Sequence, residues 1–176
     1  MIYEPREDSL LLQKQVRQYV KKGDVVLDVG TGSGIQAATA LKITDKVIAV
    51  DINPQAVQRV KKEHPRIKVI QSDLFSKVPK GEKFDVIIFN PPYLPEEERE
   101  SFEERLVLVG GKYGHEILER FFKQARSHLK PKGKMLVVFS SLTGDIKEII
   151  KKLGYSMKEL AEESYFFEKI AVYLIT

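Results

Sequence analysis

The sequence predicts an α/β fold in which helices cover both faces of a mostly parallel β-sheet. Its apolar runs are too continuous for strands with one wet face, so we expect burial on both faces. Segments with helical spacing alternate with these runs, which is the pattern of βαβ units. Glycine, an acid or an amide follows the first four runs. At 176 residues the chain suits one domain, residues 1–176, with a sizeable core.

The N-terminal segment is expected to form an amphipathic helix. Tyr3-Glu4-Pro5-Arg6-Glu7-Asp8-Ser9 leads into an apolar pattern that runs from Leu10 to Val20. A proline near the start and acids in the first turn favour a helix N-terminus. By itself, this pattern predicts a capped helix that covers a sheet.

The first strand, Asp24 to Gly30, is followed by the turn Thr31-Gly32-Ser33-Gly34 and a helix over Ile35 to Leu41. Strand, glycine turn and helix are the parts of a nucleotide-binding βαβ unit, where glycines let a ligand approach the backbone. The spacing Gly-x-Gly-x-Gly departs from the dinucleotide fingerprint. On its own, this turn indicates a nucleotide-like ligand only weakly.

Acidic residues end the next two strands. Lys46 to Asp51 is read as a strand whose final acid is placed for the two hydroxyls of a ribose, and Pro54 opens the helix from Gln55 to Glu63. After the strand Ile67 to Gln71, Asp73 and Leu74 could bind the amino group of an adenine and pack on its ring. Ligands of open α/β sheets bind at this carboxyl edge.

The fourth strand, Phe84 to Phe89, delivers Asn90-Pro91-Pro92-Tyr93 to the same edge. The two prolines stiffen the loop and leave the Pro91 carbonyl as a free acceptor beside the Asn90 side-chain oxygen. Two neighbouring acceptors match the two hydrogens of one planar NH2 group, and Tyr93 offers a flat face for stacking. An ordinary proline-stiffened turn is the simpler interpretation of these four residues alone.

The C-terminal half continues the alternating pattern. Residues 96–104 contain six glutamates and one arginine, which we interpret as a solvated loop or short helix. The glycine-rich stretch Gly110-Gly111-Lys112-Tyr113-Gly114 follows. The expected elements after it are a helix over His115 to Leu129, a strand over Lys134 to Phe139, a helix over Asp145 to Leu153, and an antiparallel pair over Tyr155 to Leu160 and Phe166 to Ile175.

Composition narrows the classes of function. The absence of cysteine excludes disulfides, thiolate catalysis and cysteine zinc sites, and the three scattered histidines lack metal-ligand spacing. A net charge of +4 permits nucleic-acid binding without requiring it. No stretch is long and apolar enough for a membrane span, and the start lacks a basic, apolar signal sequence. We therefore expect a cytoplasmic protein that binds no metal and no membrane.

Together, these motifs resemble class I S-adenosylmethionine-dependent methyltransferases. Asp28 to Gly34 is similar to the first motif of that family, Asp51 to its ribose-binding acid, and Asn90 to Tyr93 to its amino-methylating motif. The start Tyr3 to Ser9 and the stretch Gly110 to Gly114 resemble, more narrowly, the HemK-type protein glutamine methyltransferases of the short archaeal and eukaryotic branch, which lacks the extra N-terminal domain of bacterial members.

The resemblance implies a Rossmann-like fold whose seven strands have the order 3-2-1-4-5-7-6, with strand 7 antiparallel. It implies that S-adenosylmethionine is the cofactor and S-adenosylhomocysteine the product, and that the substrate is the glutamine of a Gly-Gly-Gln loop in a class 1 release factor. Catalysis would rest on Asn90, Pro91, Pro92 and Tyr93; the residues implied to bind the cofactor are Ser9, Asp28, Gly30, Gly32, Gly34, Asp51, Asp73, Leu74 and Asn90.

The resemblance also implies a partner. Members of the short branch commonly work with a small zinc-binding activator protein. In the implied strand order the third strand is an edge, so Ile67 to Gln71 could pair with a strand of such a partner.

Other functions stay open at the level of sequence. The same Asn-Pro-Pro-Tyr motif serves enzymes that methylate adenine N6 or guanine N2 in RNA or DNA, and methylation of lysine is also conceivable. The acidic run after Tyr93 and the lack of an appended nucleic-acid-binding domain argue against a base as acceptor. A non-catalytic cofactor-binding module and a nicotinamide-dependent dehydrogenase are alternatives from other classes.

Overall fold

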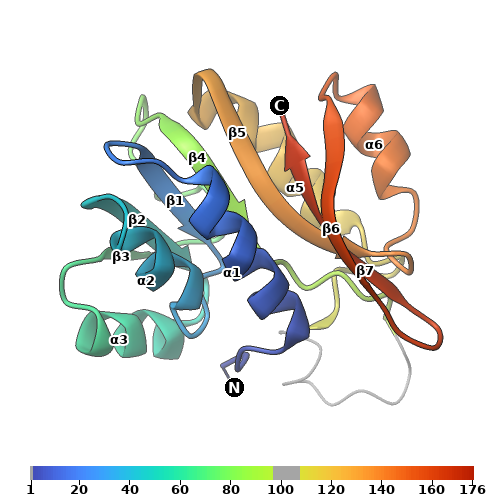
Figure 1. Cartoon of the computed structure of the whole chain (residues 1–176), viewed down its shortest axis with the longest axis horizontal. Coiled ribbons are helices and arrows are strands. Elements are labelled where there is room, and N and C mark those ends of the chain that lie inside the picture. The colour runs from blue at the N-terminus through green and yellow to red at the C-terminus, as the bar shows by residue number, and fades with distance from the viewer. Residues whose placement is uncertain (1, 97–107) are drawn as a thin grey trace.

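The computed structural model of the chain describes residues 2–96 and 108–176. It contains one seven-stranded sheet with the order β3-β2-β1-β4-β5-β7-β6, which is the order that the family resemblance implied (Figure 1). Strands β1 to β5 are parallel, and β7 lies antiparallel between β5 and β6. The strands are β1 Val25–Val29, β2 Lys46–Asp51, β3 Lys68–Gln71, β4 Phe84–Phe89, β5 Leu129–Ser140, β6 Met157–Ser164 and β7 Lys169–Ile175.

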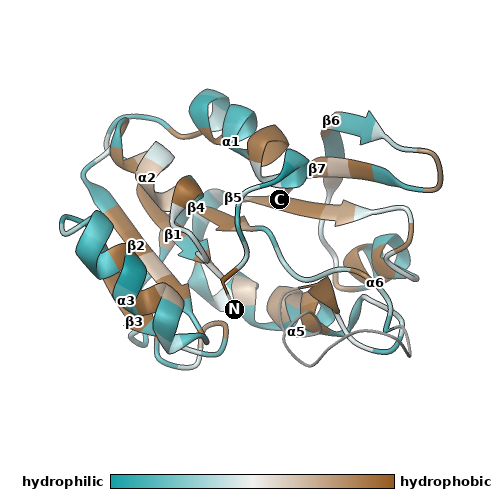
Figure 2. Ribbon diagram, turned by 90° about the horizontal axis from the view of Figure 1, so that it is seen from below, coloured by the Kyte–Doolittle hydropathy of each residue, from teal (hydrophilic) through white to brown (hydrophobic). Residues whose placement is uncertain are grey.

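Helices cover both faces of this sheet (Figures 1 and 2). Helices α1 and α2 pack against each other on one face, and α5 and α6 pack against each other on the other face. The helices are α1 Glu7–Tyr19, α2 Ile35–Leu41, α3 Pro54–Glu63, α5 Glu116–Ala125 and α6 Ile146–Lys152, with the short 3-10 helix η1 Arg126–His128. No helix in the described part of the chain is long and apolar enough to cross a bilayer.

The core fills the space between the sheet and the two helix layers. Side chains of the central strands are excluded from solvent on both faces, as their continuous apolar sequence predicted. The ring of Phe121 from α5 lies 4.6 Å from that of Phe89, the last residue of β4. Burial of a phenylalanine contributes about 2 to 3 kcal/mol, so this contact fixes the strand end from which the Asn90 loop starts.

The boundary between α5 and β5 differs from the prediction. The expected helix over His115 to Leu129 ends at Ala125, and β5 begins at Leu129 rather than at Lys134. Leu129 pairs with Phe84, and the register then shifts, so that Val86 pairs with Lys134. The extra residues form an irregularity in which Lys130 makes an ion pair with Asp85 at 2.6 Å. Helical spacing of apolar residues could not reveal this tertiary pairing.

The C-terminal antiparallel pair was predicted correctly, but its turn was not. The strands were expected to span Tyr155 to Leu160 and Phe166 to Ile175; β6 instead extends to Ser164, and β7 begins at Lys169. Phe166 and Phe167 lie in the connection, with 93% and 83% of their surface exposed. Most of the predicted acidic run of residues 96–104 lies outside the described residues.

Candidate active site

A cavity of about 720 Å³ opens at the carboxyl edge of the parallel strands. Its walls come from the segments that follow β1, β2, β3 and β4, closed on one side by the N-terminal segment and the start of α1. The structure brings nearly every residue predicted for the site to this cavity. The predicted residues that line it are Ser9, Asp28, Gly30, Gly32, Asp51, Asp73, Leu74, Asn90, Pro91, Pro92 and Tyr93.

The turn after β1 is held open by backbone conformation and by Asp51. Gly30 has a φ of +61°, and a Cβ at this position would lie 3.3 Å from the ring of Phe89. Asp51 accepts hydrogen bonds from the backbone N–H groups of Gly32 and Asn53, both at 2.8 Å. Burial raises the pKa of Asp51, and these two donors oppose the shift. The acid therefore orders the glycine turn while it lines the cavity.

Asp28 is the most deeply buried acid of the site. Its Oδ2 atom accepts hydrogen bonds from the Thr31 hydroxyl at 2.6 Å and from the Ala37 N–H at 3.1 Å. Desolvation nevertheless raises the pKa of Asp28 to about 7, with a smaller contribution from the nearby charge of Asp51. At neutral pH this carboxyl is therefore poised between its charged and neutral forms, and a cationic ligand group would favour the charged one.

The third strand end carries Asp73 and Leu74. Leu74 is buried and has a φ of +47°, a rare conformation for a branched residue. Asp73 lies at the rim, where its carboxylate pairs with Arg120 of α5 at 2.6 Å. Arg120 also lines the cavity, so an adenine bound here would contact an ion pair rather than a lone acid.

Asn90 is fixed by a buried hydrogen-bond network. Its Nδ2 donates to Asp8 Oδ2 at 3.1 Å and to Ser9 Oγ at 3.2 Å. Asp8 is 3% exposed and also accepts hydrogen bonds from the hydroxyl of Tyr3 at 3.0 Å. Since both acceptors stand at the start of α1, this helix determines which way the Asn90 amide points.

The consequence is a free acceptor at the Asn90 side chain. Because the Nδ2 group points toward Asp8 and Ser9, Oδ1 points away from these two residues. Oδ1 is buried without a hydrogen-bond partner among the described residues. Within the described chain, the Pro91 carbonyl likewise receives no hydrogen bond. Buried polar atoms are nearly always paired in native proteins, so an unpaired acceptor beside a second one indicates a place for a ligand's donors.

Tyr93 stands at the end of this loop. It is 9% exposed, its hydroxyl lies 3.5 Å from Asp8 Oδ2, and its carbonyl accepts a hydrogen bond from Thr143 Oγ1 at 3.0 Å. Burial, and the negative charge of Asp8 after it, raise the pKa of the Tyr93 hydroxyl. The ring is therefore neutral and held from both ends, as a stacking surface requires.

Gly34 is the one predicted site residue that does not line the cavity. It has a φ of +85° at the N-cap of α2, and a Cβ here would lie 3.0 Å from a methyl group of Val60 in α3. The residue serves the turn and the close packing of α2 on α3. The structure gives it no direct place in the ligand site.

Two residues that line the cavity, Asp8 and Arg120, were missed by sequence reasoning. Asp8 was noted only as a neighbour of Ser9, although it falls on the same helix face as the buried Leu12 and Gln15. An acid on the buried face of an amphipathic helix is a signal in the sequence that could have identified Asp8 as a site residue. Arg120, by contrast, carries no local signal, because only the fold brings α5 to the end of β3.

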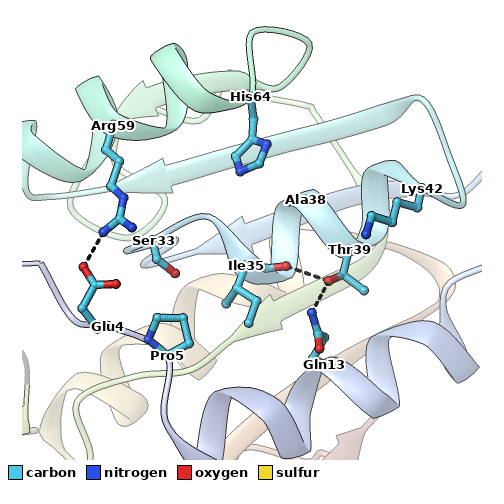
Figure 3. Close-up of a pocket in the computed structure, with 10 residues that line it drawn as sticks. All are labelled: Glu4, Pro5, Gln13, Ser33, Ile35, Ala38, Thr39, Lys42, Arg59 and His64. Atoms are coloured by element: carbon cyan, nitrogen blue, oxygen red, sulfur yellow. Dashed lines mark hydrogen bonds and ion pairs between the residues drawn. The ribbon is translucent and has the colours of Figure 1, made fainter.

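A second, smaller cleft of about 380 Å³ lies among α1, α2 and α3 (Figure 3). In it, Glu4 of the N-terminal segment pairs with Arg59 of α3, and Gln13 of α1 donates to Thr39 of α2 at 2.9 Å. These contacts hold the N-terminal segment against α3 and α1 against α2. In the described part of the chain, no three His, Cys, Asp or Glu side chains gather as a metal site would require.

Comparisons with known proteins show the family to which the chain belongs. The family model described as "Methyltransferase small domain" matches residues 7–168. The chain is 42% identical over 180 residues to a protein of Methanocaldococcus jannaschii with the name "Putative protein N5-glutamine methyltransferase MJ0928", and the match covers 97% of this chain and 89% of that protein.

A second relative is the release factor glutamine methyltransferase of Koribacter versatilis, 39% identical over 140 residues. That match covers 72% of this chain but 50% of the relative, so the chain spans about half the length of this bacterial protein. Among solved structures, a chain of the E. cuniculi Mtq2–Trm112 complex, which methylates the termination factor eRF1, has a TM-score of 0.78 at 24% identity. The match covers 99% of this chain and 97% of that one.

Proposed function

Because the chain belongs to the methyltransferase small domain family, we propose that it is a protein glutamine methyltransferase acting on the Gly-Gly-Gln loop of a class 1 release factor. The observation that carries this proposal is that neither Asn90 Oδ1 nor the carbonyl of the next residue, Pro91, has a hydrogen-bond partner among the residues that the structure describes. The relatives named as glutamine and release factor methyltransferases support the choice of acceptor.

The cavity residues fit S-adenosylmethionine as the cofactor. Asp28 is a buried acid with a pKa of about 7, and a cationic amino group bound next to it would lower this pKa. Gly30 has no side chain, so the backbone is accessible where the methionine part would lie. Asp51 would receive the ribose hydroxyls, and Asp73 with Leu74 would contact the adenine. Ser9 and Gly32 line the same cavity. When bound, this cofactor supplies an electrophilic methyl group and leaves as S-adenosylhomocysteine.

The chemical problem for the chain's own residues is the weak nucleophile. An amide nitrogen shares its lone pair with the carbonyl, so it must be held in an orientation that exposes that lone pair. We assign Asn90 Oδ1 and the Pro91 carbonyl to the two amide hydrogens, with Pro92 stiffening the loop and Tyr93 stacking on the amide plane. Fixed orientation of this kind lowers a barrier by several kcal/mol. The methylated nitrogen gives up one of its two protons to solvent when the product leaves the cavity, so no residue in this scheme acts as a strong base, and the scheme uses no metal.

Access to Asn90 Oδ1 requires a local movement. Oδ1 is closed off from solvent, so the glutamine amide of the substrate reaches it only when side chains that line the cavity move aside. Ile2 and Tyr3 of the N-terminal segment line the same cavity. Their displacement would admit the glutamine while water stays excluded from the amide.

We also propose that the β3 edge binds a small zinc-binding activator protein. Among the described residues, strand β3 pairs only with β2, so within this part of the chain the backbone of Lys68–Gln71 has a side free for another strand. Ile52 next to this edge is 63% exposed, and its carbonyl accepts from Gln71 Nε2 at 3.3 Å. The neighbouring structure was itself determined as a complex with a second protein.

Transfer of a labelled methyl group from S-adenosylmethionine tests the proposed function. The chain, alone and with a zinc-binding activator, would be offered its cognate release factor, the same factor with the Gly-Gly-Gln glutamine changed, and total RNA. We expect label on the unchanged factor only, with more label when the activator is present. Label on RNA alone would overturn the assignment of glutamine as the methyl acceptor and place the enzyme among the base methyltransferases.

A further inference from the structure

Exposed apolar side chains gather at one end of the molecule. Among the described residues, seven large hydrophobic side chains are exposed, and Leu10 on α1 is the exception to their clustering. The others follow the carboxyl ends of parallel strands or belong to the connection between β6 and β7: Ile52, Tyr113, Leu142, Tyr165, Phe166 and Phe167. Tyr165, Phe166 and Phe167 are consecutive in the chain, and exposed apolar surface that is continuous in this way marks interaction sites.

Tyr165, Phe166 and Phe167, which we call the aromatic tip, form the most exposed part of this surface. Phe166 and Phe167 are 93% and 83% exposed, and their rings meet edge to face with centroids 4.7 Å apart. The hairpin that carries them projects beyond the sheet on the side where the N-terminus lies (Figure 1). Two adjacent phenylalanines with this exposure bury little apolar surface in the fold, which favours a role in binding.

The hairpin that carries the aromatic tip is joined at its base to the segment that holds Tyr93. The end of β5 holds this base, because Ser141 N–H donates to the Lys169 carbonyl at 2.8 Å and Lys169 N–H donates to Ser141 Oγ at 3.0 Å. Two residues after Ser141, Thr143 Oγ1 donates to the Tyr93 carbonyl at 3.0 Å, and α1 contacts both β6 and β7. The hairpin, α1 and the Asn90 loop are therefore neighbours in the fold.

The surroundings of the aromatic tip are acidic. Glu163 accepts a hydrogen bond from the Tyr165 hydroxyl at 2.8 Å, and Glu162 pairs with Lys169. Glu168 Oε1 is buried without a partner among the described residues. Carboxylates around an apolar surface oppose a phosphate backbone and complement a polypeptide with apolar and basic side chains.

We propose that the aromatic tip docks the protein substrate, by burying an apolar segment of the release factor while Glu163 receives its basic side chains. This proposal rests on the proposed function. The tip contacts parts of the substrate that lie outside the Gly-Gly-Gln loop, so it contributes to affinity for the whole factor and not to the chemistry of the amide.

The double variant Phe166→Ser/Phe167→Ser tests the proposal, with Leu10→Ser as a matched control at an exposed apolar residue away from the tip. Steady-state methyl transfer would be measured on the intact release factor and on a short synthetic peptide that contains only the Gly-Gly-Gln loop. We expect KM for the intact factor to rise at least tenfold, while kcat, the rate with the peptide and the melting temperature stay as in the wild type. The control should behave as the wild type with both substrates.

Two outcomes would overturn the docking role, and they are distinguishable. If the wild type methylates the release factor and the double variant shows the same KM, the aromatic tip is not the docking surface and the proposed function stands. If the wild type does not methylate the factor at all, the proposed function fails, and the docking role fails with it.

Discussion

At the scale of single residues, the site depends on which way one amide points. Asn90 carries an acceptor and a donor of nearly equal shape, and its own sequence neighbours do not choose between two orientations. Asp8 and Ser9 make the choice, because both offer oxygen atoms to Nδ2. The motif alone predicted two acceptors at this loop, whereas the network that aims one of them could be seen only in the fold.

Asp8→Asn should disturb this orientation with little change in volume. An amide at position 8 presents N–H donors toward a site where Asn90, Tyr3 and Ser9 already point donors. We expect kcat on the release factor to fall about tenfold or more, since misplacement by an ångström can cost that much. Glu7→Gln, the same change at the exposed neighbouring residue, should leave kcat unaltered. Equal rates for the two variants would contradict this role of Asp8.

Asp28 gives a pH-dependent prediction. Burial raises its pKa to about 7 in the folded chain, whereas an unfolded aspartate titrates near 4. The folded state thus keeps a proton that the unfolded chain has released, so stability falls as pH rises from about 4 to 7. The loss is about 4 kcal/mol in total.

Asp28→Asn imitates the protonated carboxyl and cannot lose a proton. Relative to the wild type, the variant should therefore gain stability steadily between pH 4 and pH 7 and show no further gain above it. Urea unfolding of both proteins at pH 5 and pH 8, without cofactor, measures this difference. A wild-type-to-variant difference that is the same at both pH values would refute the assignment.

At the scale of elements, the glycines of the turn between β1 and α2 have different positions: one lines the cavity, and another packs against a neighbouring helix. The sequence showed three alternating glycines and could not distinguish their roles. Gly30 lies under the cavity, whereas Gly34 lets α2 approach α3. The distinction depends on Val60 and on the ring of Phe89, which come from other parts of the chain.

Gly34→Ala should be destabilising through crowding as well as backbone strain. Gly23 is the matched control, since its φ of +90° is close to the +85° of Gly34 but no atom lies within 4 Å of its virtual Cβ. We expect Gly23→Ala to cost about 1 kcal/mol and Gly34→Ala about 1 to 3 kcal/mol more. Denaturant unfolding provides both values. Equal costs would show that α3 yields freely to the added methyl group.

The elements that were predicted with wrong bounds share a physical cause. Periodicity located α5, β5, β6 and β7, because burial of one face leaves a pattern in the sequence. It failed where a tertiary contact or a function overrides that pattern. Leu129 follows the helical spacing but pairs with Phe84, and Phe166 with Phe167 resembles a strand but forms an exposed tip.

At the scale of the whole molecule, strand order and site follow from one another. Because β1 to β4 are parallel, their carboxyl ends place Asp28, Asp51, Asp73 and Asn90 around one cavity. This convergence was predictable from the positions of the strands, without any knowledge of their contacts. The sequence pattern does not specify where helices and connecting segments lie, so it could not place Arg120, Tyr3 or the tip of the hairpin.

Ligand-induced stabilisation tests the cofactor at this scale. S-adenosylhomocysteine at 100 times its Kd should add about 2.7 kcal/mol of stability, which raises the melting temperature of a domain of this size by about 5 to 10 °C. NAD at the same concentration should leave the melting temperature unchanged. Stabilisation by NAD without stabilisation by S-adenosylhomocysteine would instead support a dehydrogenase.

In the proposed mechanism, Asn90 Oδ1 and the Pro91 carbonyl hold a planar NH2 group for methylation. A single-turnover measurement of methyl transfer to the release factor by Asn90→Ala and by the wild type, both saturated with S-adenosylmethionine, tests this role. We expect the variant to transfer the methyl group about 100-fold more slowly or worse, as for loss of a hydrogen-bonding partner in a transition state. A variant that transfers the group at the wild-type rate would contradict it.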